Sequence, residues 1–304
     1  MRSLDGILLV DKPAGETSFQ TIKRVRRAIK IQKVGHAGTL DPFATGLLII
    51  MLGQATKLSP YLMAGVKHYQ GIIHLGVETE TMDPEGRVTR IKDVPPFGLK
   101  AIQEVVQGFI GEIEQTPPSY SALKHKGKRA YALARQGIKV DLPKRVVRIL
   151  AIEICSVDLP EIVLKVRCSG GTYIRRLAAD IGGKLGTGAH LKALRRLSSG
   201  PFNVENALES TKDSMDEACI MEHMIPLADS LPDMPAIQLD HLTARRILNG
   251  YKPDENDLFS GSIVPDDYHG PIKLLDGSIL IAVMEVKRIV GGNQGWIKKM
   301  RIFH

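Results

Sequence analysis

The apolar residues in the first half of the chain gather in short runs that predict buried β-strands. Residues 6–10, 46–53 and 70–76 are runs of this kind, and the turn sequence Asp-Lys-Pro-Ala-Gly at 11–15 closes the first of them. Continuous apolar runs of this length are typical of strands covered on both faces. Residues 165–168 instead alternate polar and apolar side chains, which predicts a strand with one exposed face.

Two segments carry apolar residues at helical spacing. The first follows Thr17 or Ser18 as the expected N-cap, and its apolar face is predicted to consist of Phe19, Ile22, Val25 and Ile29. Cations lie largely off that face, at Lys23, Arg24, Arg26, Arg27 and Lys30. The second helix is expected after Gly170-Gly171, with Thr172 as its cap and an apolar face of Ile174, Leu177, Ile181 and Leu185. Strands and helices thus alternate without a strict β-α-β order, which favours an α/β (α+β) fold with a mixed sheet.

The composition changes beyond residue 202, where an acidic stretch and prolines at 226, 232 and 235 indicate a domain boundary near residue 230. We therefore expect a domain at 1–230 and a small β-rich domain at 234–304. In the second domain, residues 279–286 and 296–303 are strand-like, and the glycines at 291, 292 and 295 supply turn chemistry between them.

The 43% hydrophobic and 24% charged residues are typical of a soluble globular protein. The longest clean apolar run, 47–52, is far shorter than a membrane span, and the first residues lack a signal-peptide pattern. The three cysteines form no Cys-x-x-Cys pair, which excludes a zinc ribbon and fits a reducing compartment. We expect a cytoplasmic protein in which each cysteine acts as a small apolar residue.

The net charge of +8 is unevenly distributed. Residues 205–240 contain nine acidic residues and one basic residue, so the remainder of the chain carries +16. A body of this charge attracts polyanions, which makes nucleic acid the leading class of partner and predicts that the acidic segment faces away from it.

The densest candidate site is Gly35-His-Ala-Gly-Thr-Leu-Asp-Pro-Phe-Ala-Thr-Gly46. On pattern alone Asp41-Pro42 is most simply the start of a turn, and His36 a structural histidine. The whole segment, however, closely resembles the catalytic motif of the TruB-type tRNA pseudouridine synthases. Further segments resemble other family motifs in the family's order, namely 11–18, 67–86, 117–131, 169–175 and 188–197.

The resemblance implies a pseudouridine synthase fold, a mainly antiparallel sheet flanked by helices, with a C-terminal PUA-like RNA-binding domain. It implies isomerisation of uridine 55 in the T arm of tRNA, a reaction that needs neither cofactor nor metal. Asp41 matches the catalytic aspartate and Arg175 the arginine paired with it. Tyr69 matches the tyrosine that stacks on the flipped uracil. Tyr173 and Leu194 match family positions that line the uracil pocket, and His36 matches the histidine that contacts the T loop.

The sequence leaves open the partners, the oligomeric state and two alternative functions. The chain lacks the long basic extensions of guide-RNA-dependent relatives, so we expect a stand-alone enzyme without a guide RNA. No coiled-coil seam is evident, which favours a monomer. A non-catalytic RNA-binding protein or tRNA-folding chaperone is the alternative, and the presence of Asp41, Tyr69 and Arg175 argues for the enzyme. The same chemistry on another RNA is a third possibility.

Overall fold

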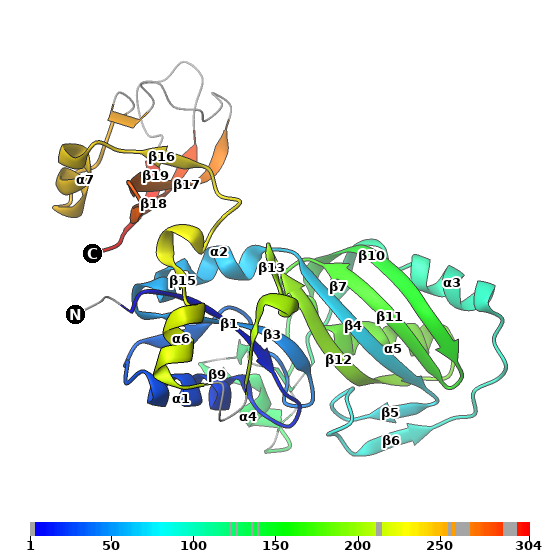
Figure 1. Cartoon of the computed structure of the whole chain (residues 1–304). Helices are drawn as coiled ribbons and strands as arrows, with labels where there is room; N and C mark the ends of the chain where they lie inside the picture. Colours follow the sequence, from blue (N-terminus) through cyan, green and yellow to red (C-terminus); the bar gives the residue numbers. More distant parts are fainter. Residues whose placement is uncertain are drawn as a thin grey trace.

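The computed structural model describes residues 4–118, 120–121, 123–125, 127–134, 136–138, 140–210, 215–254, 257–258, 268–287 and 297–304. A large mixed sheet runs through the first 230 residues (Figure 1). Its main path is β14 (Leu208–Glu209), β1 (Gly6–Lys12), β3 (Thr45–Leu52), β12 (Ala189–Ser199), β4 (Lys67–Leu75), β11 (Glu161–Cys168), β10 (Arg145–Asp158) and β7 (Gly111–Gln115). Short strands extend it: β2 (Val34–His36) on β3, β13 (Phe202–Asn203) on β12 and β15 (Ile225–Pro226) on β1.

Most neighbours in this sheet are antiparallel, but its two halves meet at a parallel pair. Strand β3 lies beside β12 in parallel register through Thr45 opposite Arg195 and Gly46 opposite Arg196. Gly46 has φ +100°, and a Cβ there would lie 2.3 Å from the carbonyl oxygen of Arg196. A side chain at position 46 is therefore excluded by both the backbone conformation and the close approach of β12. The mixed, mainly antiparallel sheet predicted from the sequence is confirmed.

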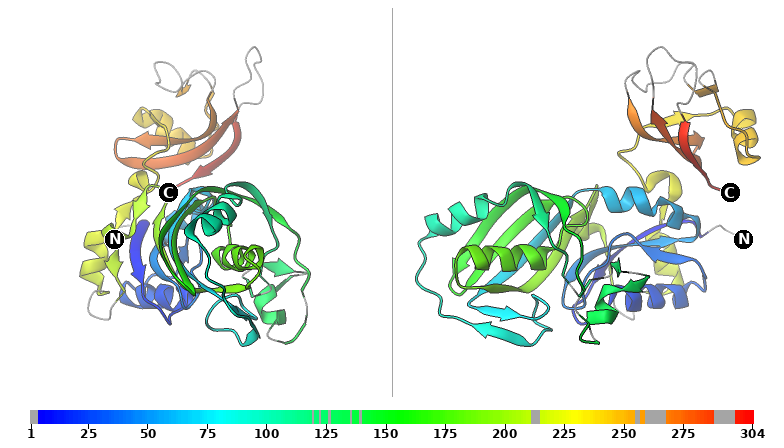
Figure 2. Two further views of the ribbon diagram at one scale, coloured as in Figure 1. Left: turned by 90° about the vertical axis from the view of Figure 1, so that its right-hand side faces the viewer. Right: turned by 180° about the vertical axis from the view of Figure 1, so that it is seen from behind.

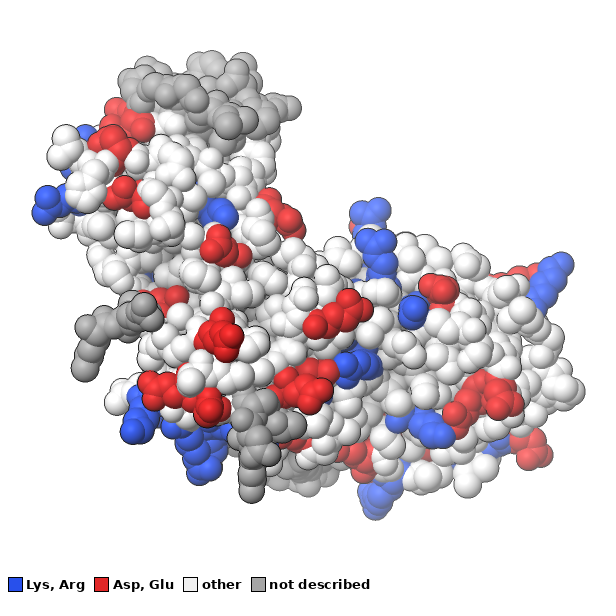
Figure 3. Space-filling view, in the orientation of Figure 1, with Lys and Arg blue, Asp and Glu red and all other residues white. Residues whose placement is uncertain are grey.

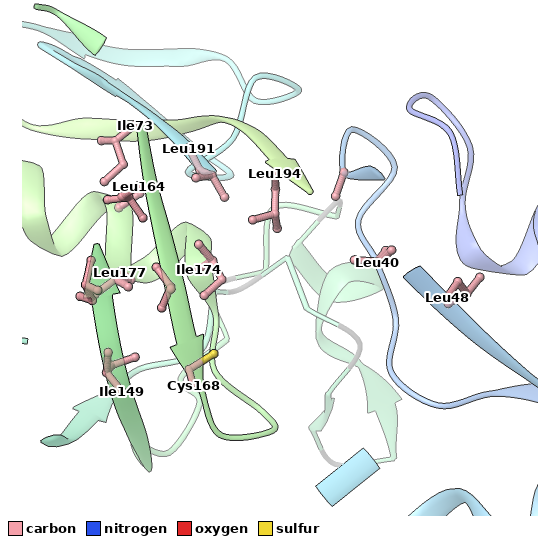
Figure 4. Packing of buried hydrophobic residues seen from close by; sticks show 14 of the residues in the cluster. Leu40, Leu48, Ile73, Ile149, Leu164, Cys168, Ile174, Leu177, Leu191 and Leu194 are labelled. Carbon is pink, nitrogen blue, oxygen red and sulfur yellow. The ribbon is translucent and has the colours of Figure 1, made fainter. Parts of the chain in front are cut away.

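The sheet curls around two helices, α3 (Leu99–Gln107) and α5 (Ile174–Lys184) (Figure 2). Their apolar sides pack on its concave face: Ile174 and Leu177 of α5 lie beside Leu164 of β11 and Leu191 of β12 (Figure 4). The other half of the sheet carries α1 (Ser18–Ala28) and α6 (Glu217–His223). The buried cluster continues through Leu8, Val25 and Leu48 of that half, so one core joins both halves.

Smaller elements complete the first 230 residues. They are the 3₁₀-helices η1 (Gly53–Leu58), η2 (Val204–Asn206) and η3 (Leu227–Asp229), the helices α2 (Ser59–Ala64) and α4 (Ala130–Ala134), and the hairpins β5 (Val77–Thr79) with β6 (Val88–Ile91) and β8 (Lys124–His125) with β9 (Lys128–Arg129).

The C-terminal residues form their own sheet, in the order β16 (Ala236–Gln238), β17 (His269–Asp276), β18 (Ile279–Lys287) and β19 (Ile297–Ile302), with α7 (His241–Leu248) packed against it. This module is not separated from the rest of the chain. Leu280, Val283 and Phe303 join an apolar cluster with Leu47 and Leu58. The Lys57 ammonium donates to the Ile302 carbonyl at 2.6 Å. The module is therefore anchored on the η1–α2 segment.

The predicted strands are all present, and the two predicted helices are α1 and α5. Thr17 caps α1 as predicted, in a capping box with Gln20. Three details of the prediction are wrong. Strand β4 is not covered on both faces, since Gln70 is exposed and Ile72 and His74 are half-buried. Phe19 is 70% exposed, because it lies on the side of α1 that faces away from the sheet. Tyr173, not Thr172, is the N-cap of α5; the Thr172 hydroxyl donates to the Ser169 carbonyl instead. The glycine turn predicted at 291–295 lies outside the described residues.

None of the helices in the described residues is long and apolar enough to span a membrane. The three cysteines are free thiols. Cys168 is buried as expected, whereas Cys155 is exposed, so the prediction of an apolar packing role is wrong for Cys155.

Candidate active site

The loop that carries Asp41 joins β2 to β3 and is fixed by contacts from several segments. The Ser18 hydroxyl donates to the Leu40 carbonyl at 3.0 Å and accepts from the Leu40 amide at 2.9 Å. The Gly15 amide donates to the Pro42 carbonyl at 2.8 Å. The buried Arg196 guanidinium donates to the Gly38 carbonyl at 3.1 Å. Because both sides of Asp41 are held in this way, its carboxylate is presented on a rigid backbone.

Lys12 is the innermost of these anchors. Its side chain is fully buried, and its ammonium donates to the carbonyls of Pro13, Glu16 and Pro42 at 2.7, 2.6 and 3.2 Å. Burial lowers the pKa of Lys12 to about 8, while the carboxylates of Glu16 and Asp41 act in the opposite direction. Lys12 thus ties the end of β1 to the residue after Asp41 and places a cation near the carboxylate.

Arg175 forms the centre of the site from the first turn of α5. Its Nε lies 2.9 Å from Oδ2 of Asp41, and its Nη2 donates to Oδ1 at 3.1 Å. Its Nη1 donates to Oδ2 of Asp83 at 2.9 Å. The carbonyls of Thr81 and Tyr120 each accept a further bond of 3.0 Å. The planar fork of arginine suits this bidentate geometry, which a lysine could not reproduce.

The side chains of Arg175, Asp83 and Asp41 differ in how much of their surface a ligand can reach. The Arg175 side chain is 5% exposed and that of Asp83 4%, whereas that of Asp41 is 34% exposed. Asp83 also accepts bonds from the Thr81 hydroxyl and the Glu85 amide, so its lone pairs are engaged within the protein. Asp41 is therefore the member of the trio that a ligand can reach.

The electrostatics of Asp41 balance burial against nearby cations. Burial raises the pKa of Asp41, and the neighbouring Asp83 carboxylate acts in the same direction. The guanidinium of Arg175 and the ammonium of Lys12 oppose this rise and favour the ionised form. The site thus holds a carboxylate whose protonation depends on its pairing with Arg175.

Tyr69 and Leu194 lie on neighbouring strands and face the same side of the sheet. The Cα of Tyr69 on β4 pairs with that of Arg196 on β12, and Leu194 pairs with Gly71. Burial raises the pKa of Tyr69, so its phenol is neutral near pH 7. The Asp41 carboxylate contributes to this rise, which places Tyr69 within its electrostatic reach.

Tyr173 and His36 enter the site from other elements. Tyr173 directly precedes α5; its amide donates to the Gln115 side chain at 3.0 Å, and its carbonyl accepts from the same amide group at 3.3 Å. Burial raises the pKa of Tyr173, and Asp41 adds to the rise. His36 is half-buried at the end of β2, opposite Ile50 of β3. The structure thus links Asp41, Arg175, Tyr69 and Tyr173 electrostatically, while His36 lies five residues before Asp41 on the approach to its loop.

The sequence analysis did not single out Asp83 or Lys12. Both lie in segments that resemble family motifs, but nothing local distinguishes them from surface charges. The sequence gives one indirect signal for Asp83: a buried arginine such as Arg175 needs more hydrogen-bond acceptors than one carboxylate offers, so a second acceptor is expected beside it. In the part of the chain that the structure describes, no group of three or more His, Cys, Asp or Glu side chains is placed to hold a metal ion.

Sequence models of a known enzyme class match this chain. The TruB family pseudouridylate synthase N-terminal domain matches residues 26–174, and the tRNA pseudouridylate synthase B C-terminal domain matches residues 175–232. Curated relatives named tRNA pseudouridine synthase B include one from Syntrophus aciditrophicus, 42% identical over 91% of this chain and 86% of the relative. Another, from Geotalea uraniireducens, is 39% identical over 98% of this chain and 96% of the relative.

Solved structures agree on the fold. A chain from the crystal structure of a Cbf5-Nop10-Gar1 complex superposes with a TM-score of 0.73 at 23% identity, covering 98% of this chain and 84% of that one. The family models and the curated relatives define the class of protein as a pseudouridylate synthase. This chain belongs to the TruB family.

Proposed function

We propose that the protein is a tRNA pseudouridine synthase that isomerises uridine 55 in the T arm of tRNA. The observation that carries the proposal is the bidentate ion pair between Arg175 and the partly exposed Asp41 in the loop between β2 and β3. The names of the curated relatives support tRNA as the substrate class.

The reaction breaks the C1′–N1 bond of the nucleotide, turns the uracil, and joins C1′ to C5, from which a proton is then lost. N1 of the uracil gains a proton in exchange, so the product is an isomer of the substrate and no co-reactant is needed. An ionised carboxylate at this place can add to the base, attack C1′ or abstract the C2′ proton. All three steps use the same carboxylate, that of Asp41, and all three require it unprotonated. Arg175 keeps the charged form available against the effect of burial.

The target base has to leave its stack before Asp41 can reach it, which costs a few kcal/mol. An aromatic face returns about 1–3 kcal/mol per stacked base. In our proposal Tyr69 supplies that face, and Tyr173 and Leu194 line the remainder of the uracil pocket. His36 contacts the T loop where the flipped nucleotides were. The neutral phenols of Tyr69 and Tyr173 and the apolar side chain of Leu194 suit an uncharged base.

The proposed enzyme acts as a monomer in the cytoplasm, without a guide RNA. Residues 1–230 form the catalytic domain and residues 234–304 a PUA-like domain that contacts RNA. One exposed cation of β19, Lys299, supports this second contact. Relatives named for tRNA, rather than for a ribonucleoprotein, support the stand-alone arrangement.

Tritium release from tRNA transcript labelled at uridine C5 tests the function directly. With metal chelated and no cofactor added, we expect one label released per tRNA, because joining C1′ to C5 expels that hydrogen. Replacing the T-loop target uridine by cytidine should abolish the release. Absence of release from the wild-type protein, with tight salt-dependent tRNA binding, would identify a non-catalytic RNA-binding protein or chaperone instead.

A further inference from the structure

Helix α1 exposes one continuous stripe that the catalytic machinery does not use. Phe19, Lys23, Arg26 and Lys30 follow one another at spacings of four, three and four residues, which places them on one face of the helix and the turn after it. Arg27 lies beside Arg26 on the same exposed side. Phe19, with 70% of its surface accessible, is an unusually exposed aromatic residue. We call these five residues the α1 stripe.

The cations of the stripe are not engaged by acidic side chains. Within the part of the chain that the structure describes, no ion pair involves Lys23, Arg26, Arg27 or Lys30. Arg24 on the same helix differs, since it binds the Glu16 carboxylate and the Ser210 carbonyl. A shallow hollow of about 320 Å³ follows the stripe, and it is lined by Lys23, Arg26, Arg27, Lys30, Ile31 and Gln32. The hollow contains positive charge without a carboxylate, which is the chemistry of an anion-binding surface.

The stripe begins at the active-site loop. Ser18, the residue before Phe19, exchanges two hydrogen bonds with Leu40, the residue before Asp41. From Phe19 to Ala28 the helix extends about 14 Å away from that point, and Lys30 follows in the turn after it. Helix α1 lies on the same side of the molecule as α4 and the β5–β6 hairpin (Figures 1 and 2). Basic side chains gather at the corresponding lower left edge of the surface (Figure 3).

We propose that the α1 stripe binds the sugar-phosphate backbone of the substrate RNA, with Phe19 packed against a base or ribose at the end nearest Asp41. The inference rests on the proposed function, because it takes the RNA that enters the active site as the ligand. Phosphates of the RNA release their condensed counterions to the solvent when they meet exposed cations that lack carboxylate partners. The exposed aromatic ring of Phe19, at one end of this row of cations, gives a stacking surface that accepts any base.

The test compares RNA binding and turnover in variants of the full-length protein. Lys23→Gln and the double variant Lys23→Gln/Arg27→Gln are titrated with unmodified full-length tRNA transcript by fluorescence anisotropy at several KCl concentrations. We expect the slope of log affinity against log salt to fall by about 1 per lost cation. The double variant should bind about tenfold more weakly at low salt. In turnover assays KM should rise while kcat stays within about twofold.

Phe19→Ala separates stacking from charge. We expect its affinity to fall about fivefold or more with an unchanged salt slope, because no phosphate contact is removed. Lys100→Gln is the matched control, since Lys100 is an exposed lysine near the start of another helix, α3. It should change neither affinity nor slope. Thermal unfolding of each variant should match the wild type, as all the substituted side chains are exposed.

Two results would overturn the proposal: affinity and salt slope unchanged in the double variant, or losses of equal size in Lys100→Gln. The binding readout does not depend on turnover. If the wild-type protein releases no tritium yet the stripe variants lose RNA affinity, the proposed reaction fails and the RNA surface stands. If tritium release is normal and the stripe variants bind as the wild type does, the proposed reaction stands and the proposed RNA surface fails.

Discussion

The guanidinium of Arg175 contacts both carboxylate oxygens of Asp41, at 2.9 and 3.1 Å, and holds Asp83 at 2.9 Å with its remaining terminal nitrogen. One buried cation is thus shared between a carboxylate that a ligand can reach and another that it cannot. This division lets Asp83 fix the arginine while Asp41 remains available for chemistry. The predictions below follow from it.

Asp41→Asn should reduce tritium release at least about a thousandfold, because the amide can neither act as a nucleophile nor accept a proton. Affinity for tRNA should stay within a few-fold, since the carboxylate performs chemistry and is not an anchor for phosphates. The measurement is single-turnover release beside anisotropy titration. Near-normal turnover in this variant would refute the assignment of Asp41.

The same substitution should not weaken the fold. Because burial raises the pKa of Asp41 in the folded protein, folding favours its protonated form, and the ionised form present at neutral pH costs stability. An uncharged asparagine removes that cost and still accepts a bond from Arg175. We expect a Tm at pH 7 that is equal to the wild type or higher by up to about 3 °C. A drop of more than about 5 °C would mean that the ion pair stabilises the fold.

The acid limb of the pH–rate profile should report the protonation of Asp41. Its pKa lies above the ordinary value of 3.8, so kcat/KM should rise with pH through the raised value and then level off. Arg175→Met removes the main opposing cation, so the limb should move to higher pH and the plateau should fall. Arg175→Lys keeps a charge but not the fork, so its limb should lie between those of the wild type and the Met variant. A limb that stays in place in Arg175→Met would contradict the pairing argument.

Asp83→Ala should destabilise the fold by about 3 kcal/mol in urea unfolding, because alanine, unlike the asparagine of Asp41→Asn, leaves the buried guanidinium without an acceptor at that position. Activity should fall as well, since Arg175 loses the contact that orients it. Asp83→Asn keeps the shape and removes a carboxylate that raises the pKa of Asp41, so its acid limb should move to lower pH. Asp93→Asn is the control, as Asp93 is an exposed carboxylate outside the site, and its unfolding free energy should match the wild type.

Local sequence patterns predicted the helices and strands well, because capping and hydrophobic runs depend on residues that are close together in the chain. The capping box at Thr17 and the apolar run of β3 depend on neighbours in the chain. Thr172 is not the cap because its hydroxyl donates to the Ser169 carbonyl, and the backbone of Tyr173 is held by Gln115, 58 residues earlier in the chain. Phe19 has helical spacing, yet the buried face of α1 is formed by Ser18, Thr21, Ile22 and Val25, and Phe19 lies outside it.

The candidate site needed more than local pattern. Asp41 and Arg175 were paired through family resemblance, since spacing alone made Asp41 a turn residue. Asp83 lies 92 residues from Arg175 along the chain, and only the folded sheet brings them together. Lys12 was equally hidden, because a lysine after an apolar strand is ordinarily a surface residue. Its burial follows from three carbonyls that converge on it.

Gly46→Ala should disrupt the junction of the two halves of the sheet. Its φ of +100° disfavours any side chain, and the new Cβ would lie 2.3 Å from the Arg196 carbonyl oxygen and 2.7 Å from the Arg196 nitrogen. Since both neighbours are backbone atoms, β3 and β12 would have to separate. We expect a loss of about 3 kcal/mol or more, measured by urea unfolding, together with loss of activity because the Asp41 loop leads directly into β3.

Gly15→Ala is the matched control: it also has a positive φ, +77°, but a Cβ there meets nothing within 4 Å. Its cost should be that of the backbone conformation alone, about 1 kcal/mol. Equal losses in the two variants would show that backbone conformation, and not the approach of β12, requires glycine at position 46.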